Sequence, residues 1–233
     1  MDTARHADTA VALAGLGAYA RLRLFSLVSQ EVWNAPTIET AHLLVKRSIS
    51  IGQQEQKLVD VAAAHGADVT AAMAPFTGVL DTFVTRTRTE DWWENLLKAV
   101  VGHGVLRDFL RLLSRGLDAD IAAQFTEVLK EDGEEDQVSF RLLRDAVAAD
   151  SVLGSRLGLW GRRVMGETLK LSVDMMARSP LVDSLAVTVA AQADVDGVDF
   201  TTTMQATSAA RAWVLKHITA EHSARMESLG LEP

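Results

Sequence analysis

The chain has 233 residues, a length that suits one sizeable hydrophobic core and is short for two independent ones. It has no cysteine, which excludes disulfides, thiolate-bound zinc and cysteine-ligated iron–sulfur clusters. The formal net charge of -8 opposes non-specific attachment to nucleic acid or anionic lipid. With 4 prolines and 48% hydrophobic residues at mostly helical spacing, the sequence predicts an all-α fold, and we expect a single domain over residues 1–233.

The first predicted helix spans about Thr9 to Trp33. Its apolar start ends in Ala18-Tyr19-Ala20, which superficially suits a signal-peptidase site, but early aspartates spoil the cationic region that such signals need. The apolar spacing also continues past Arg21, so we interpret this segment as the first core helix. No run reaches the length of a membrane span, and we predict a cytoplasmic protein without membrane contact.

The next predicted helix runs from about Pro36 to His65 and ends at Gly66. Residues 67–89 lack a long period and resemble a crossover connection. A third helix then begins around residues 89–91 and stops near Gly116.

A fourth helix, capped by Asp118 or Asp120, is predicted to continue to about Ala149, and a fifth from Ser151 to just before Pro180. Residues 181–200 are ambiguous because they include a short stretch of strand propensity, and residues 202–229 form a last helix. Two helical hairpins joined by a long crossover predict a ferritin-like four-helix bundle with additional C-terminal helices.

Ionisable residues interrupt the apolar stripe of two predicted helices. His103 stands between glycines at a position that shares a face with core residues, and Glu131 and Glu134 flank Gly133 on the stripe of the following helix. Polar groups inside a bundle are costly unless paired, and facing helices often hold them for a metal site. The alternative is an acidic kink that faces solvent.

A family resemblance rests on six stretches of the chain: Leu16-Gly-Ala-Tyr19, Ala72-Met-Ala-Pro-Phe76, Leu80-Asp-Thr-Phe83, Lys98-Ala-Val-Val-Gly102, Leu159-Trp-Gly-Arg-Arg-Val-Met-Gly-Glu167 and His222-Ser-Ala-Arg-Met226. They resemble an actinobacterial ferritin-like family related to the MiaE-type tRNA hydroxylases. The similarity runs from about Leu13 to Leu231. It implies a non-haem diiron centre inside the bundle that activates dioxygen to hydroxylate a modified tRNA adenosine.

The expected diiron ligands are largely replaced in this chain. Arg21 stands where the resemblance implies a glutamate, and the glutamate-x-x-histidine pair becomes Ser50 and Gln53, or Ile51 and Gln54 if the alignment slips by one residue.

In the third helix a glycine-aspartate becomes Gly102-His103, with Asp108 nearby, and in the fourth an aspartate-x-x-histidine becomes Glu131 and Glu134. Arginine offers no lone pair and repels iron. We therefore predict no functional metal, with iron as the cofactor only if the family site survives and a mononuclear or foreign metal on the residual ligands as a further alternative.

A fixed positive charge can take the place of a lost metal. We predict that Arg21 points toward the acids of the fourth helix and pairs with Glu131 or Glu134, with His103 close by. The function that follows is an interaction or scaffold protein; the alternative is an oxygen-dependent hydroxylase, diiron or mononuclear, acting on modified tRNA or another substrate.

Other patterns have plainer interpretations. Glu39 and His42 also form a glutamate-x-x-histidine pair, but such a pair arises easily by chance. Arg162, Arg163 and Glu167 could bind a phosphate, although ion pairs within the helix or with the acidic patch around Glu134 are favoured.

Trp92 and Trp93 open a helix. We expect one of them to pack inward and the other to cover a surface or dimer contact rather than stack on bases. The excess of apolar residues predicts a homodimer or a pairing with a related ferritin-like subunit; tRNA as a partner is implied by the resemblance alone.

Overall fold

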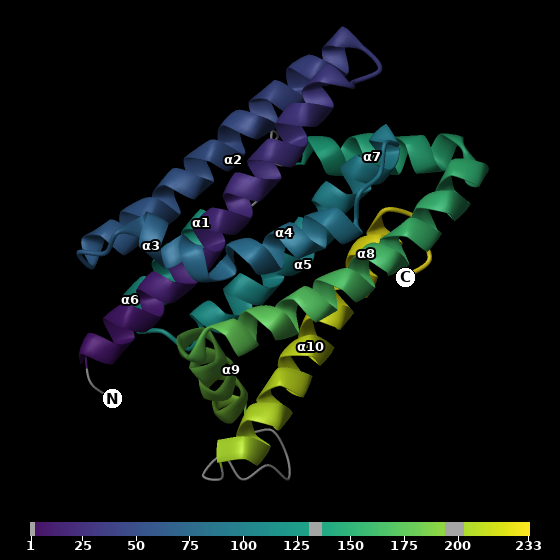
Figure 1. Ribbon diagram of the computed structural model, residues 1–233. Helices are drawn as coiled ribbons and strands as arrows, with labels where there is room; N and C mark the ends of the chain where they lie inside the picture. Colours follow the sequence, from purple (N-terminus) through teal and green to yellow (C-terminus); the bar gives the residue numbers. More distant parts are fainter. Residues whose placement is uncertain (1–2, 131–136, 194–202) are drawn as a thin grey trace.

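The computed structural model describes residues 3–130, 137–193 and 203–233, and within these ranges every regular element is a helix (Figure 1). The elements in chain order are α1 (Thr3–Trp33), α2 (Ile38–Ala64), α3 (Val69–Met73), a 3₁₀ turn (Ala74–Phe76), α4 (Thr77–Arg86), α5 (Trp92–Ser114), α6 (Ala119–Val128), α7 (Val138–Ala149), α8 (Ser151–Arg178), α9 (Pro180–Gln192) and α10 (Thr203–Ser228). The all-α prediction is confirmed.

Local signals explain where several helices begin. The Asp68, Asp91 and Asp150 side chains accept hydrogen bonds from the first backbone N–H groups of α3, α5 and α8. Gly66 ends the α2 segment with a φ of 71°, which an L side chain rarely adopts. Asp118 also precedes a helix, but its carboxylate pairs with His6 at 2.8 Å instead of capping α6.

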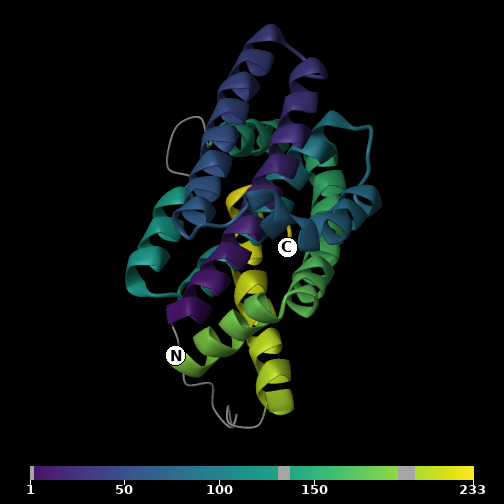
Figure 2. The same cartoon turned by 60° about the vertical axis from the view of Figure 1, so that its left-hand side comes forward.

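The α1–α2 hairpin is antiparallel, and its turn projects beyond the other helices (Figures 1 and 2). Helix α5 runs antiparallel to α1, because Trp92 at its start donates to the carbonyl of Glu31 at 3.2 Å while Leu110 lies against Gly17. Leu16 and Leu24 are buried, as predicted for a core helix.

The fourth helix of the bundle is interrupted. Both α6 and α7 contact α2 and α5, so together they occupy the fourth position, with Phe125, Val128 and Leu143 buried. The prediction of one continuous helix to Ala149 was wrong, because α6 ends at Val128. The apolar period continues across the break and so did not reveal it.

The crossover and the C-terminal part are more helical than expected. Residues 67–89 form α3, the 3₁₀ turn and α4, and Figure 2 shows α4 on one flank of the hairpin and α6 on the other. The ambiguous region after Pro180 is helical to Gln192. Helices α8, α9 and α10 pack against α5 and one another. The single domain over residues 1–233 stays a prediction.

The sequence predicted no run long enough to span a membrane, but one helix of the structure passes that test by length and composition. The helix His6–Trp33 is long and apolar enough by composition to cross a membrane, with a mean hydropathy of 1.4 in its most apolar window. Of that window, 61% is buried inside the bundle, as in the core helix of a globular protein. The apolar character therefore matches the core role of α1 in this fold.

Candidate functional site

The centre of the bundle carries a buried guanidinium on α1. Arg21 is 3% exposed and lies one turn after Gly17, whose backbone faces Leu58 of α2. By the antiparallel register, Arg21 is level with Gln54, one turn before Leu58. Gln54 is buried and donates to the carbonyl of Lys130 at 3.2 Å. The residue immediately before Glu131 therefore lies next to Gln54.

A largely buried ion pair joins α5 to α10. Asp108 accepts from Arg225 of α10, and both side chains are 11% exposed. Arg107 adds a second guanidinium at 3.1 Å from the same carboxylate. Gly104, one turn before Asp108, makes room for this arrangement, because a Cβ there would lie 2.7 Å from Nε of Arg225.

Two histidines are buried near this level. Burial and the neighbouring Arg225 guanidinium lower the pKa of His222 to about 4, so His222 is neutral at physiological pH. His103 is 8% exposed, as its position on the apolar face predicts.

These residues do not suit a diiron centre. Arg21 presents cationic N–H groups, Gln54 offers only a neutral amide oxygen in place of a carboxylate or imidazole, and the Asp108 carboxylate is engaged by arginines. Within residues 3–130, 137–193 and 203–233, no three His, Asp or Glu side chains gather as metal ligands. Glu131 and Glu134 lie outside the described residues, so their pairing with Arg21 stays a prediction.

Burial shows which of the two alternative pairs of ligand positions on α2 faces the core. Ser50 is half-buried and Gln53 is exposed, whereas Ile51 and Gln54 face the core, so the slipped alignment gives the inward positions. Glu39 and His42 are both exposed on the outer face of α2, where neither approaches the bundle centre.

The phosphate site, the less favoured interpretation of these α8 residues, is not assembled. Arg162 donates to the carbonyl of Glu232 at 3.2 Å, while Arg163 donates to the carbonyl of Arg86 and lies over the Trp160 ring. Glu167 pairs with Arg86 at 3.3 Å rather than with an arginine of its own helix. The two guanidinium groups serve separate backbone contacts.

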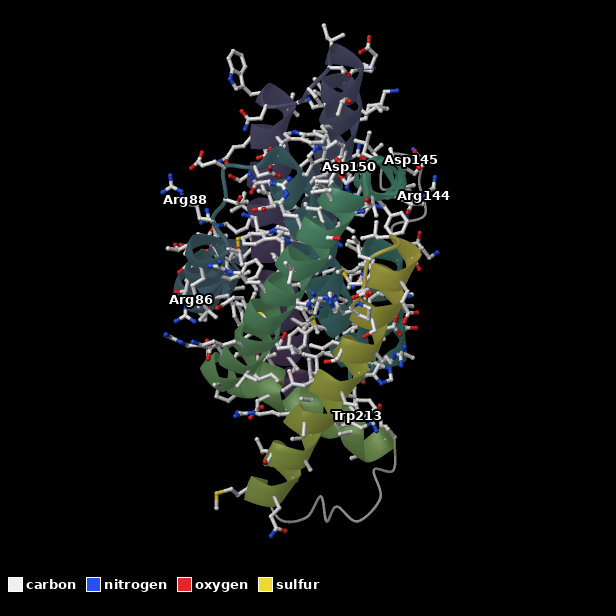
Figure 3. The ribbon with its side chains drawn as sticks, turned by 90° about the vertical axis from the view of Figure 1, so that its right-hand side faces the viewer. Arg86, Arg88, Arg144, Asp145, Asp150 and Trp213 are labelled. Atoms are coloured by element: carbon white, nitrogen blue, oxygen red, sulfur yellow. The ribbon has the colours of Figure 1, made fainter. Side chains whose placement is uncertain are left out.

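A second polar region, which the sequence patterns above did not identify, is a cavity of about 490 Å³ between α1, α4 and α5. Its walls combine charged, amide and apolar side chains, and His103 is among them. The lining residues that matter below are Glu31, Asn34, Phe83, Arg88, Asn95 and Lys98. In Figure 3, Arg86 and Arg88 stand out on one flank of the molecule, and Arg144 and Asp145 lie on the opposite one.

Glu31 is the buried acid of the cavity, at 3% exposure. Burial raises the pKa of its carboxyl, while hydrogen bonds from Asn34 and Asn95 and the charge of Lys98 act in the opposite direction. One carboxyl oxygen, Oε2, has no hydrogen-bond partner in the described part of the chain. Unsatisfied buried acceptors are rare and often mark functional positions.

Lys98 is the buried base, at 5% exposure. Its Nζ donates to the carbonyl of Thr87 at 3.0 Å, and burial lowers the pKa of the ammonium, partly offset by the Glu31 charge. An acid and a base whose pKa values burial displaces in opposite directions, facing one cavity, are typical of a binding or catalytic site.

A signal for this cavity was present in the sequence. Glu31 continues the buried stripe of Leu24 and Val28 at helical spacing, the same argument that singled out His103. Lys98 opens one of the stretches that carry the family resemblance. What the pattern could not show is that the two meet.

Trp92 and Trp93 lie where the start of α5 meets the end of α1. Their rings meet edge to face with centroids 4.7 Å apart, and both are half-buried. Because Trp92 bonds to the backbone of Glu31, this pair fixes the end of α1 against α5.

The interrupted bundle with its helical crossover defines a ferritin-like class of protein. The chain matches the family model for the ferritin-like domain of actinomycetes over residues 4–189, and it belongs to that family. The match covers α1 to α9 as far as Val189, and α10, which supplies Arg225, follows it. No curated protein matches the chain.

Proposed function

We propose that this chain is a ferritin-like protein that acts by binding, with fixed positive charge in place of iron at the bundle centre. The observation that carries the proposal is Arg21, a buried guanidinium at a position where the diiron pattern requires a carboxylate. A guanidinium cannot coordinate a metal and repels cations nearby.

The resemblance to MiaE-type tRNA hydroxylases is on this proposal a matter of ancestry rather than shared chemistry. The net charge of -8 also disfavours a tRNA substrate, because nucleic-acid affinity depends on neutralising phosphates with basic side chains. The oxygen-dependent hydroxylase is the competing function, and metal content separates the two.

The first test is the iron content of full-length protein purified from iron-supplemented cells and measured by plasma mass spectrometry. We expect well below one iron per chain. Stoichiometric iron that survives gel filtration would overturn the proposal and favour the hydroxylase.

A gain-of-function variant sharpens this test. Arg21→Glu combined with Ile51→Glu and Gln54→His places metal ligands on the inward positions of α1 and α2, and we expect it to bind Co²⁺ with a visible absorption band.

The matched control shifts the α2 substitutions by one residue, to Ser50→Glu and Gln53→His with the same Arg21→Glu. Since Gln53 is exposed, this control should gain no band. Circular dichroism should show that both variants are folded. Equal Co²⁺ binding by the two would mean that the inward positions next to Arg21 are not the ones from which metal is excluded.

We further propose that binding includes self-association through the outer face of the α1–α2 hairpin. Exposed apolar side chains line this face on both helices: Leu22 and Phe25 from α1, Val45 and Ile49 from α2. Arg23 beside them is held by Asp81 at 2.5 Å, which leaves the strip largely uncharged. A two-fold axis brings such a strip onto its own copy without like-charge repulsion.

Light scattering tests this part of the proposal. We expect twice the chain mass at micromolar concentration, and a monomer for the Phe25→Glu and Ile49→Glu double variant. A wild-type monomer would overturn self-association, and a related ferritin-like subunit would then be sought by co-expression.

A further inference from the structure

Two buried and opposite charges face the cavity between α1, α4 and α5 without a direct ion pair. The Glu31 carboxyl keeps Oε2 without a partner among the described residues, and Lys98 uses its ammonium on a single backbone carbonyl. An ammonium has three donors, so Lys98 can make further hydrogen bonds. Buried charges are costly unless a partner of opposite sign satisfies them.

The other charges around the cavity already have partners. Arg23 is held by Asp81, and Arg88, which stands at the outer rim, pairs weakly with Glu90 at 3.4 Å. The rim is therefore close to charge balance. Arg23 Nε has no hydrogen-bond partner among the described residues, but its guanidinium is already paired with Asp81. In the interior, Glu31 Oε2 and the Lys98 ammonium keep hydrogen-bonding capacity for a ligand.

We propose that this cavity binds a small zwitterion, a free amino acid or a molecule that pairs an ammonium with a carboxylate in the same way. The ligand ammonium donates to Glu31, and the ligand carboxylate accepts from Lys98. Apolar lining from Leu27, Phe83 and Val84 contacts the rest of the ligand. A volume of about 490 Å³ is ample for a molecule of this size.

Charge balance selects this class over simpler ones. A lone amine pairs with Glu31 but places a second positive charge beside Lys98. A lone carboxylate pairs with Lys98 but places a second negative charge beside Glu31. A neutral hydroxyl can bridge the two groups, but it forms weaker hydrogen bonds than a charged partner. The zwitterion alone pairs both charges and keeps the site neutral.

Asn34 and Asn95 hold the acid in place for this role. Both side chains donate to the Glu31 carboxyl, and Asn95 also donates to the carbonyl of Thr89 at 3.2 Å. The carboxyl is thus oriented by the end of α1 and the start of α5 before any ligand arrives. Such preorganisation lowers the entropic cost of binding.

This inference goes beyond the proposed function and does not depend on it. The cavity binds its ligand whether or not iron occupies the bundle centre, so metal content and amino-acid binding can fail separately. Neither Arg21 and Gln54 nor Asp108 and Arg225 line the cavity.

The experiment is a binding screen on the full chain by isothermal calorimetry and thermal shift, using the twenty standard amino acids as probes. Methylamine, acetate and glucose serve as single-function comparisons. We expect one or more amino acids to bind and raise the melting temperature, and the three comparison compounds to have no effect at equal concentration.

Two variants connect binding to the cavity. Glu31→Gln and Lys98→Met keep the side-chain shape, and each should weaken binding about tenfold or more, because each leaves one charge of the ligand unpaired. Arg162→Gln, at a separate surface cavity bordered by Gly158 and Leu231, should leave binding unchanged. Circular dichroism confirms that each variant is folded.

A second measurement reports the mechanism directly. Carbon-13 NMR of the Glu31 carboxyl should show its pKa falling when the bound amino acid supplies an ammonium. The proposal is overturned if no amino acid binds at about 10 mM, a concentration that detects even very weak affinity. Binding that acetate, methylamine or glucose reproduces, or that survives both cavity substitutions, overturns it as well.

Discussion

Two regions of the molecule bury charged side chains, and they satisfy them in different ways. Between α5 and α10, the Asp108 carboxylate is paired with Arg225 and with Arg107 on the protein's own helices. Glu31 and Lys98 both line the cavity between α1, α4 and α5, but they do not form a direct ion pair with each other. A charge with an internal partner contributes to the fold, whereas a charge that lacks one indicates a site for a ligand.

The largest expected effect comes from breaking the paired region. Asp108→Asn keeps the side-chain shape but removes the negative charge, which leaves Arg225 and Arg107 uncompensated. We expect a loss of about 3 kcal/mol in the free energy of unfolding, measured by urea denaturation.

The exposed pair Arg88 and Glu90 supplies the control. Glu90→Gln should change stability by less than about 0.5 kcal/mol, because surface ion pairs contribute little. The double variant Asp108→Leu with Arg225→Met should recover the part of the loss that comes from the unpaired Arg225 charge, while Arg107 stays uncompensated. No recovery would show that Asp108 acts through shape instead.

Acidification provides the next largest effect. The pKa of His222 is about 4 in the folded protein and near its ordinary value of 6.5 when unfolded, so the unfolded state binds the proton more readily between these values. Stability is therefore fully present above pH 6.5 and falls as the pH drops toward 4, by roughly 3 kcal/mol at most.

A substitution isolates this titration. His222→Gln should flatten the stability profile between pH 6.5 and 4, whereas His217→Gln on the exposed face of α10 should leave it unchanged. A profile that keeps its full slope in His222→Gln would assign the acid sensitivity to other groups.

Close packing around the ion pair gives a third, smaller effect. In Gly104→Ala the new methyl group would meet the Arg225 guanidinium at 2.7–2.8 Å and displace it from Asp108. We expect a loss of about 1–3 kcal/mol by thermal denaturation, as for other overpacked cores.

Gly166→Ala is the matched control on α8. Nothing lies within 4 Å of the added methyl group, and removing a helical glycine should stabilise the protein by about 0.5–1 kcal/mol. Equal effects of the two substitutions would mean that Arg225 moves aside freely.

The sequence predicted the helices well and the sites only in part. Helical spacing identified α1, α2, α5 and α8 and the burial of His103, because a stripe of apolar residues depends on the local chain alone. The break after Val128 was missed because the stripe continues across it.

Tertiary placement accounts for the remaining misses. Glu31 and Lys98 are 67 positions apart, and only the antiparallel packing of α1 on α5 brings them to one cavity. Arg162 and Arg163 are adjacent in sequence, yet they reach backbone carbonyls from opposite parts of the chain, Glu232 and Arg86. The sequence favoured ion pairs within the helix or with the acidic patch for these arginines, whereas the fold directs each of them to a backbone carbonyl.

The smallest expected effect has the opposite sign and concerns the cavity. Replacing both buried charges, in Glu31→Gln with Lys98→Met, removes two desolvated groups that the protein does not pair internally. Because burial disfavours the charged form of each group, we expect the double variant to be more stable than wild type by about 1 kcal/mol at pH 7 in urea denaturation. A gain in stability together with a loss of amino-acid binding would indicate that Glu31 and Lys98 serve ligand binding at a cost to stability. A loss of 2 kcal/mol or more would instead mean that Glu31 and Lys98 hold α1 against α5, and the contrast with Asp108 would disappear.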